Sequence, residues 1–264
     1  MDRIARYIAV TSVALAPISV SAQSQVSLVP GWQDPDGKRY AGVQITLEPG
    51  WKTYWRSPEG NGIPPQFDWA GSGNLADVQI HWPEPVVFTT YGVRSIGYEN
   101  RVIFPVTLTP KDPGAPIDVR LGLFYGVCEE VCIPAQAGLS SAFPPAQEAG
   151  AQDVRLALAS RPLTADEAGV THHICRIAPE GDGYSVTADV TATAALDADF
   201  AVFESGNQEL WIDVQSIEPS PSGLSIRAQM AYFGDGAFAL DRSAMRLTLF
   251  GRSGAIDLQG CPAS

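Results

Sequence analysis

The chain has 264 residues, 45% of them apolar, and its 29 acidic and 17 basic residues give a formal net charge of −12 at pH 7. Nucleic acids and anionic membrane surfaces repel such an acidic chain, so neither is expected as a partner. The apolar content suffices for packed cores, and the length exceeds that of a typical single domain. We therefore expect two domains.

The N-terminal residues predict export. Two arginines precede an apolar run that ends near Val20, and the small residues Ser21 and Ala22 offer a cleavage site. The run is shorter than a membrane span requires, and Pro17 interrupts it. We interpret residues 1–22 as a signal peptide and expect the mature protein outside the cytoplasm, where free thiols tend to oxidise.

Residues 23–145 show the alternation of apolar and polar positions that is typical of β-strands with one buried face. In "KRYAGVQITLEPG" the apolar positions run from Ala41 to Leu47, and in "IDVRLGLFYGV" they run from Ile117 to Val127. The segments "DVQIHWP" and "RVIFPVTLTP" are similar, and the proline-rich stretches between them cannot be helix interiors. This spacing predicts a β-sandwich.

The alternation stops in residues 146–163, which we interpret as a linker. Within it, "DVRLALAS" predicts a short helix that ends before Pro162. Residues 164–264 resume the strand pattern in "GYSVTADV", "ELWIDVQSI", "GLSIRAQMAYF" and "MRLTLFG". The sequence thus predicts an all-β fold in which a second, smaller β-sandwich follows the first.

Two of the four cysteines, Cys128 and Cys132, are separated by three residues. In an extended strand their Cα atoms would lie about 13 Å apart, far beyond the ~7 Å limit for a disulfide. A bond between them therefore requires a turn, which Glu129, Glu130 and Val131 can make at the end of a strand. We predict a short disulfide that closes this turn.

The other two cysteines suit a structural bond. Cys175 lies near the start of the second predicted domain and Cys261 near its end. A bond between them would contribute about 4.5 kcal/mol in the loop-entropy estimate, against about 2 kcal/mol for the short pair. We therefore assign Cys175 and Cys261 to a structural disulfide and the pair of Cys128 and Cys132 to exchange, because a strained or exposed disulfide is more easily reduced.

Two other interpretations of the short pair stay open. It can be a plain hairpin staple, or half of a zinc site that needs two more ligands. His172 and His173 precede Cys175 in "HHIC" and suggest copper or zinc, but adjacent histidines in a strand point to opposite faces. His81, beside a tryptophan, is expected to be an ordinary sheet residue. We predict no metal site and no cofactor.

The two glutamates in the turn bear on exchange. Negative charge near a thiol raises its pKa and lowers the thiolate fraction at neutral pH. Exchange then depends on a docked partner that supplies positive charge or a low-pKa attacking thiol. We include Glu129, Glu130 and the preceding Tyr125 in the surroundings of the site, although a solvated turn explains the glutamates equally well.

Four stretches within residues 25–142 together carry a family resemblance. They are, in chain order, "GWKTYWRSPEGNGIPPQFDW", "IHWPEPVVF", "GYENRVIFPV" and "FYGVCEEVCIP". Each is weak alone, but their order is specific. The region resembles the periplasmic N-terminal domain of the disulfide reductase DsbD, and more closely its relative ScsB, whose shorter cysteine spacing and two-part extracellular region also suit this chain.

The resemblance implies an immunoglobulin-like sandwich in the periplasm. Such a domain takes electrons by thiol–disulfide exchange from a membrane-embedded partner and passes them to periplasmic thioredoxin-fold proteins. Cys128 and Cys132 would be the exchanging residues, with Cys132 attacked first. The stretch "FTTYGVRS" matches a cap loop and would place Thr90 and Tyr91 near the cysteines, where an aromatic limits access of stray oxidants. The DsbD cap carries two neighbouring aromatics where this chain has Thr90 and Tyr91.

The sequence shows no counterpart of the transmembrane and thioredoxin-like domains that complete those proteins. We therefore expect a separate membrane thiol electron carrier, CcdA-like or DsbD-like, as the donor, and a role as one component of a protein-disulfide reductase. Arg56 could pair with an acidic loop or guide an acidic partner. Large aromatics dominate burial, so core packing is expected for those of these motifs: Trp51, Tyr54, Trp55, Trp69 and Trp82.

Two functions of other classes remain open. One is a non-catalytic envelope binding module in which both disulfides are structural. The other is a copper-tolerance protein, suggested by "HHIC" and by the metal-tolerance association of ScsB-like proteins. Reduction potential separates the first from exchange, because structural disulfides typically lie below about −300 mV.

Overall fold

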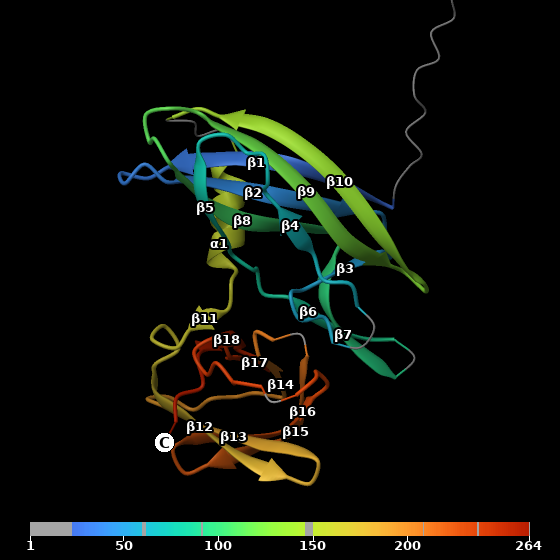
Figure 1. Ribbon diagram of the computed structural model, residues 1–264, viewed down its shortest axis with the longest axis vertical. Coiled ribbons are helices and arrows are strands. Elements are labelled where there is room, and N and C mark those ends of the chain that lie inside the picture. Colours follow the sequence, from blue (N-terminus) through green and yellow to red (C-terminus); the bar gives the residue numbers. More distant parts are fainter. Residues whose placement is uncertain are drawn as a thin grey trace, which may run out of the picture.

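The strands in the described part of the chain form four sheets that pack in two pairs (Figure 1). We call residues 24–143 the first sandwich and residues 163–263 the second sandwich.

The predicted signal peptide, residues 1–22, lies outside the described residues. No helix in the described part has the length and apolar character needed to cross a membrane. The computed structural model describes residues 23–59, 62–90, 92–145, 150–207, 209–236 and 238–263.

The first sandwich consists of two antiparallel sheets. One contains, in spatial order, β1 (Ser24–Gln33), β2 (Arg39–Leu47), β8 (Arg101–Pro110) and β5 (Leu75–Ile80). The other contains β10 (Cys132–Phe143), β9 (Ile117–Cys128), β3 (Lys52–Tyr54), β7 (Val93–Glu99) and β6 (Val86–Thr90), and β4 (Gln66–Asp68) also pairs with β9. The strand β9 is therefore flanked by β10 on one side and by β3 and β4 on the other.

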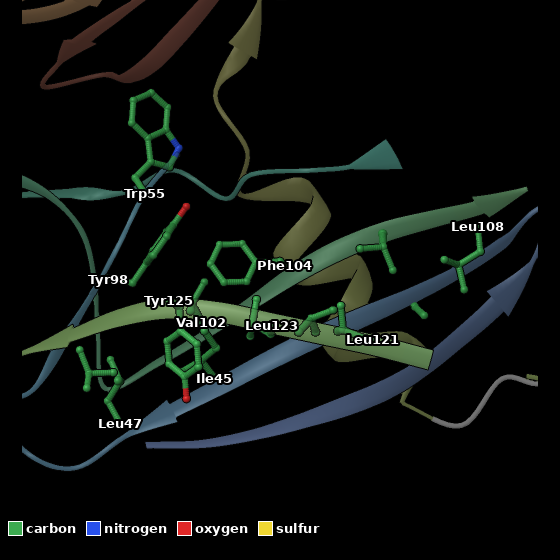
Figure 2. Packing of buried hydrophobic residues seen from close by; sticks show 14 of the residues in the cluster. Ile45, Leu47, Trp55, Tyr98, Val102, Phe104, Leu108, Leu121, Leu123 and Tyr125 are labelled. Carbon is green, nitrogen blue, oxygen red and sulfur yellow. The ribbon is translucent and has the colours of Figure 1, made fainter. Parts of the chain in front are cut away.

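The core of the first sandwich lies between its two sheets, as the alternation predicts. The apolar positions from Ala41 to Leu47 on β2 are buried, and so are those from Ile117 to Val127 on β9. Figure 2 shows these side chains meeting around Phe104, which is fully buried. The prediction of an all-β fold is confirmed.

One helix, α1 (Ala151–Ala159), lies in the segment that the sequence assigns to a linker, of which residues 146–149 are not described. It packs against β8 and β1 on the outer face of the first sheet. Its Val154 side chain is fully buried. Gly42 of β2 makes room for it, because a Cβ there would come within 3.3 Å of Val154 Cγ2. The helix therefore covers part of the first sandwich.

The second sandwich consists of two sheets of four strands each. One contains β11 (Leu163–Thr164), β18 (Gly254–Gln259), β17 (Arg246–Gly251) and β14 (Phe200–Glu204). The other contains β12 (Val170–Glu180), β13 (Gly183–Ala192), β16 (Gly223–Tyr232) and β15 (Leu210–Ser220).

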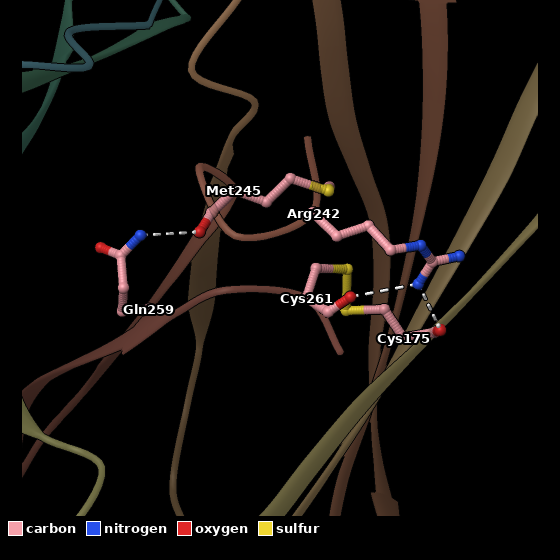
Figure 3. Close-up of a disulfide and its surroundings, with 5 residues drawn as sticks. All are labelled: Cys175, Arg242, Met245, Gln259 and Cys261. Atoms are coloured by element: carbon pink, nitrogen blue, oxygen red, sulfur yellow. Dashed lines mark hydrogen bonds between the residues drawn. A yellow bond between two sulfur atoms is a disulfide. The ribbon is translucent and has the colours of Figure 1, made fainter. Parts of the chain in front are cut away.

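A buried disulfide ties β12 to the segment that follows β18. It joins Cys175 and Cys261, which are 3% and 1% exposed. Arg242 Nη1 donates hydrogen bonds to the carbonyl oxygens of both cysteines, each at 3.1 Å (Figure 3). The bond links two segments 86 residues apart in the chain, which is the pairing that the sequence suggests.

The two sandwiches share an apolar interface. The buried residues Val202, Phe250 and Ala255 of the second sandwich pack in one cluster with the core of the first. The ring of Trp55, which follows β3, meets Phe250 edge to face with the ring centroids 5.6 Å apart. In Figure 1 the second sandwich lies next to the end of the first that carries β3, β6 and β7.

Candidate redox site

The hairpin of β9 and β10 carries the short cysteine pair at its tip. Cys128 and Cys132 are directly opposite each other in the register and form a disulfide with a Cα separation of 4.1 Å. Both are partly exposed, and the turn of residues 129–131 between them is exposed throughout, with Val131 70% accessible. The turn between the cysteines agrees with the geometric argument from their spacing.

Strand alternation decides which side chains share a face with the disulfide. On β9, Cys128 lies on the face opposite Val127, which belongs to the buried core. The neighbouring strand β3 aligns Lys52 with Cys128 and Thr53 with Val127. Lys52 and Tyr54 therefore lie on the same face as the disulfide. Directly opposed residues have Cβ atoms about 4.5–5.5 Å apart, so Lys52 is an immediate neighbour of Cys128.

Tyr54 makes the closest polar contact with the pair. Its hydroxyl oxygen lies 2.7 Å from Cys132 Sγ. A disulfide sulfur carries no proton, so the tyrosine is the donor. Only 4% of Tyr54 is exposed, and burial raises the pKa of its phenol. The hydroxyl therefore stays protonated through the neutral range and keeps its ability to donate to this sulfur.

Two glycines make room for the Tyr54 ring. A Cβ on Gly126 of β9 would lie 3.0 Å from the ring and 2.8 Å from Ile63 Cβ. A Cβ on Gly62 would lie 2.7 Å from the opposite edge of the ring. The backbone N–H of Gly126 also donates to the Ile63 carbonyl at 3.1 Å. The glycine in "FYGVC" thus allows the tyrosine to lie flat against β9 and reach the cysteine.

Lys52 lies beside Cys128 in the register but extends its positive charge toward β6. It is flanked in the register by Cys128 on β9 and by Glu99 on β7. Its Nζ lies over the ring of Phe88, 4.6 Å from the centroid, and Phe88 is 8% exposed. Phe88 belongs to "FTTYGVRS", the stretch expected to form a cap loop, which the structure places in the hairpin of β6 and β7.

The other residues predicted for the site fall into three groups. Glu129 and Glu130 are exposed beside the pair, as expected for a turn. Tyr125 lies on the opposite face of β9, where it is 2% exposed and its hydroxyl lies 2.8 Å from Ser24 Oγ. The Thr90 side chain and Tyr91 lie outside the described residues. The structure therefore brings the glutamates to the cysteines and separates Tyr125 from them.

The histidine segment does not assemble the ligand set that suggested copper. Cys175 is bonded to Cys261, so it offers no thiolate, and His172 and His173 pair with neighbouring positions of β13. Within the described ranges, no three His, Cys, Asp or Glu side chains are grouped so that they could hold a metal ion.

Sequence reasoning assigned Tyr54 to core packing with the other aromatics and gave Lys52 no role. The structure confirms core packing for Trp55, which is fully buried, but it turns Tyr54 toward the disulfide. The available signal was the two-residue spacing of Lys52 and Tyr54, which places both on one face of any strand. What the sequence could not show was that this strand lies beside Cys128.

Comparison with known proteins relates the first sandwich to one family. The model of the family "Thiol:disulfide interchange protein DsbD, N-terminal" matches residues 22–144. The crystal structure of the N-terminal periplasmic domain of ScsB from Proteus mirabilis is similar at a TM-score of 0.68 and 21% identity, covering 92% of this chain and 94% of that one. At this identity the likeness shows a shared fold.

A second solved structure is more distant. The reduced DsbD N-terminal domain from Neisseria meningitidis aligns at 16% identity and a TM-score of 0.29, over 47% of this chain and 89% of that one. A TM-score this low carries no argument about the fold. No curated protein sequence matches the chain significantly.

Proposed function

We propose that this chain, whose residues 22–144 belong to the family of DsbD N-terminal domains, is a periplasmic protein that relays reducing equivalents by thiol–disulfide exchange. Membership in a thiol–disulfide exchange family is the premise. The observation that carries the relay is the contrast between the two disulfides. Cys128 and Cys132 are partly exposed at a hairpin tip beside a hydroxyl donor, whereas Cys175 and Cys261 are buried.

The exchange proceeds in two half-reactions at Cys128 and Cys132. A donor thiolate attacks Cys132 Sγ, the bond to Cys128 breaks, and Cys128 leaves with the electron pair and takes up a proton. A second donor thiolate then attacks the donor sulfur of the mixed disulfide, and Cys132 leaves with the electron pair and takes up a proton, so that the donor is oxidised to a disulfide and the pair becomes a dithiol. The reduced pair returns the two electrons to an acceptor disulfide by the reverse sequence, with Cys132 attacking and Cys128 resolving.

Tyr54 supports the assignment of Cys132 as the attacking residue. In the reduced protein its hydroxyl is placed to donate to a Cys132 thiolate, and a hydrogen bond to the charged form lowers a thiol pKa. The exposed turn of residues 129–131 offers a partner direct access to the pair. By family analogy, the donor is a membrane thiol electron carrier, CcdA-like or DsbD-like, and the acceptors are periplasmic thioredoxin-fold proteins.

The test is the reduction potential of each disulfide in the full chain. The protein is equilibrated in defined thiol buffers, trapped by alkylation and mapped by mass spectrometry. We expect Cys128 and Cys132 to titrate between about −180 and −270 mV, the range of exchange proteins, while Cys175 and Cys261 stay bonded. If both pairs resist reduction until the chain unfolds, the short pair is a staple and the proposal fails.

A pair of single variants tests the residue assignment. Cys128→Ser and Cys132→Ser should each abolish transfer from a reduced thioredoxin-fold protein to an oxidised one, while circular dichroism shows the fold retained. Loss of folding in both variants would instead support a structural role.

A further inference from the structure

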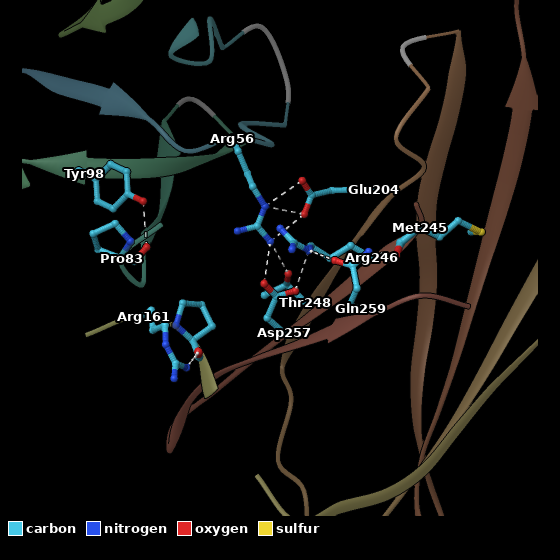
Figure 4. Close-up of polar contacts among 11 residues, drawn as sticks. Arg56, Pro83, Tyr98, Arg161, Glu204, Met245, Arg246, Thr248, Asp257 and Gln259 are labelled. Carbon is cyan, nitrogen blue, oxygen red and sulfur yellow. Dashed lines mark hydrogen bonds and ion pairs between the residues drawn. The ribbon is translucent and has the colours of Figure 1, made fainter. Parts of the chain in front are cut away.

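The two residues that follow Tyr54 in the chain are both held by the second sandwich. Arg56 is 10% exposed at its side chain, and its Nε lies 3.0 Å from each carboxylate oxygen of Glu204 on β14. Its Nη2 lies 3.1 Å from Thr248 Oγ1 on β17 and 3.4 Å from Asp257 Oδ2 on β18. Figure 4 shows this guanidinium inserted among the three second-sandwich side chains.

Trp55 completes the attachment. Its ring is fully buried and meets Phe250 of the second sandwich edge to face. The Arg56 guanidinium lies 3.9 Å from the centroid of the Trp55 ring. The aromatic and the cation therefore form one unit across the interface, and removal of either would loosen the other.

The strand β3 has few other constraints at this end. It pairs with β9 only at Lys52 and Thr53, so the register with the cysteine strand stops one residue before Tyr54. On its other side, backbone bonds to β7 continue, with Trp55 N donating to Ile96 O at 3.0 Å. The backbone of residues 55–58 thus bonds to β7, the Arg56 side chain bonds to the second sandwich, and the Trp55 ring packs against both sandwiches.

We propose that the second sandwich is a brace that holds Tyr54 against Cys132, with Arg56 as the positioning residue. This inference deepens the proposed function and rests on Cys128 and Cys132 being the exchanging pair. Arg56 binds Glu204, which lies 148 residues later in the chain. Arg56 influences the Cys132 sulfur through Tyr54, which precedes it by two residues and whose hydroxyl contacts that sulfur. The second sandwich thereby acquires a role in the chemistry of a disulfide it does not contain.

A purely structural interface is the competing explanation. Replacing both partners of a buried ion pair by apolar residues is often neutral for stability, whereas removing one partner is destabilising. Arg56→Met keeps the length of the side chain and leaves Glu204 and Asp257 without this partner, so the variant should be less stable and its fold is checked by circular dichroism. A brace predicts that this variant changes the reactivity of Cys132, whereas a merely structural contact predicts a changed melting temperature alone.

The experiment measures the alkylation rate of Cys132 by iodoacetamide as a function of pH. It uses the full chain with Cys128→Ala, so that Cys132 is a free thiol while Cys175 and Cys261 stay bonded. Tyr54→Phe should raise the thiol pKa and lower the rate at pH 7 about tenfold, because it removes a hydrogen bond to the thiolate. Arg56→Met should shift the profile in the same direction, by about threefold or more at pH 7.

The double variant decides whether Arg56 acts through Tyr54. If it does, Tyr54→Phe with Arg56→Met should be no slower than Tyr54→Phe alone, because residues that act through one contact are not additive. Arg246→Met is the matched control. Arg246 lies 3.2 Å from the other oxygen of Asp257 but belongs to the second sandwich itself, so its loss should leave the profile unchanged.

Several results would overturn the brace. An Arg56→Met or Tyr54→Phe profile equal to that of the parent would do so, as would full additivity of the two changes. The charged groups of the site itself, Lys52, Glu99, Glu129 and Glu130, are the same in all variants. If Arg56→Met fails to fold, Glu204→Gln tests the same contact from the other side. Alkylation of Cys132 needs no partner protein. If the alkylation profiles of the variants shift as expected but the parent protein transfers no electrons, the result counts against the proposed function alone.

Discussion

At the scale of single residues, the disulfide has a neighbour that favours a thiolate as well as the glutamates that disfavour it. Glu129 and Glu130 alone imply a thiol of raised pKa and slow exchange. The structure adds the Tyr54 hydroxyl at Cys132, which favours a thiolate there. A nearby hydrogen-bond donor thus counters the charge of the turn before any partner docks.

His81 gives a residue-scale prediction on acid stability. Burial, followed by the charge of Arg161, lowers the pKa of His81, whose Nε2 lies 2.8 Å from Thr107 Oγ1. The folded state therefore binds fewer protons at this site than the unfolded state does. The stabilisation is present above the unfolded pKa of about 6.5 and is lost as pH falls through the folded pKa.

His81→Gln should accordingly flatten the decline of Tm below about pH 6.5. The measurement is thermal unfolding at a series of pH values, with the Cys pairs oxidised. His172→Gln, at an exposed position of β12, is the control and should keep the parent slope. If the slope of Tm against pH is unchanged in His81→Gln, other groups govern the decline of Tm at low pH.

At the scale of elements, β3 is among the strands that sequence reasoning did not anticipate. It has three residues, too few for alternation to be visible, and it exists because β7 and β9 pair with its two edges. The stretch "FTTYGVRS", expected to match a cap loop, lies in the hairpin of β6 and β7. Longer strands such as β2 and β9 were predictable, since their apolar positions alternate over seven and eleven residues.

The hairpin of β9 and β10 offers an element-scale prediction. Gly126→Ala should lower the free energy of unfolding by about 1–3 kcal/mol and expose the disulfide, because the added methyl clashes with Tyr54 and Ile63. Urea unfolding and the rate of disulfide reduction by dithiothreitol are the measurements.

Gly138→Ala on the partner strand is the control for that change. Nothing lies within 4 Å of a Cβ at Gly138, so the free energy of unfolding of this variant should differ from that of the parent by less than about 0.5 kcal/mol. Equal effects of the two substitutions would mean that loss of glycine flexibility, and not displacement of Tyr54, governs the result.

At the scale of the whole molecule, there is a division of roles between the two disulfides. The bond of Cys175 and Cys261 closes a long loop inside a core, whereas the bond at the hairpin tip joins two residues only four positions apart that the sheet already aligns. The shared apolar interface and the Arg56 contacts then join the two sandwiches through the strand beside the exposed pair.

Removing the buried disulfide tests this division. Cys175→Ala with Cys261→Ala should lower the free energy of unfolding by about 2–5 kcal/mol, because the unfolded chain gains the freedom of a long open loop. The folded variant should still exchange through Cys128 and Cys132. Denaturant unfolding and an electron-transfer assay measure the two effects, and loss of exchange in a folded variant would contradict the division.

The sequence by itself determined the all-β class, the buried faces of the long strands, the turn between Cys128 and Cys132 and the match to an exchange family. These depend on alternation and on chain distance, which are local properties. Only the tertiary structure decided that Tyr54 reaches Cys132, that Tyr125 faces away, and that Arg56 enters the second sandwich. Those contacts join residues 78, 101 and 148 positions apart, and strand register, set by the packing of whole sheets, brings such residues together.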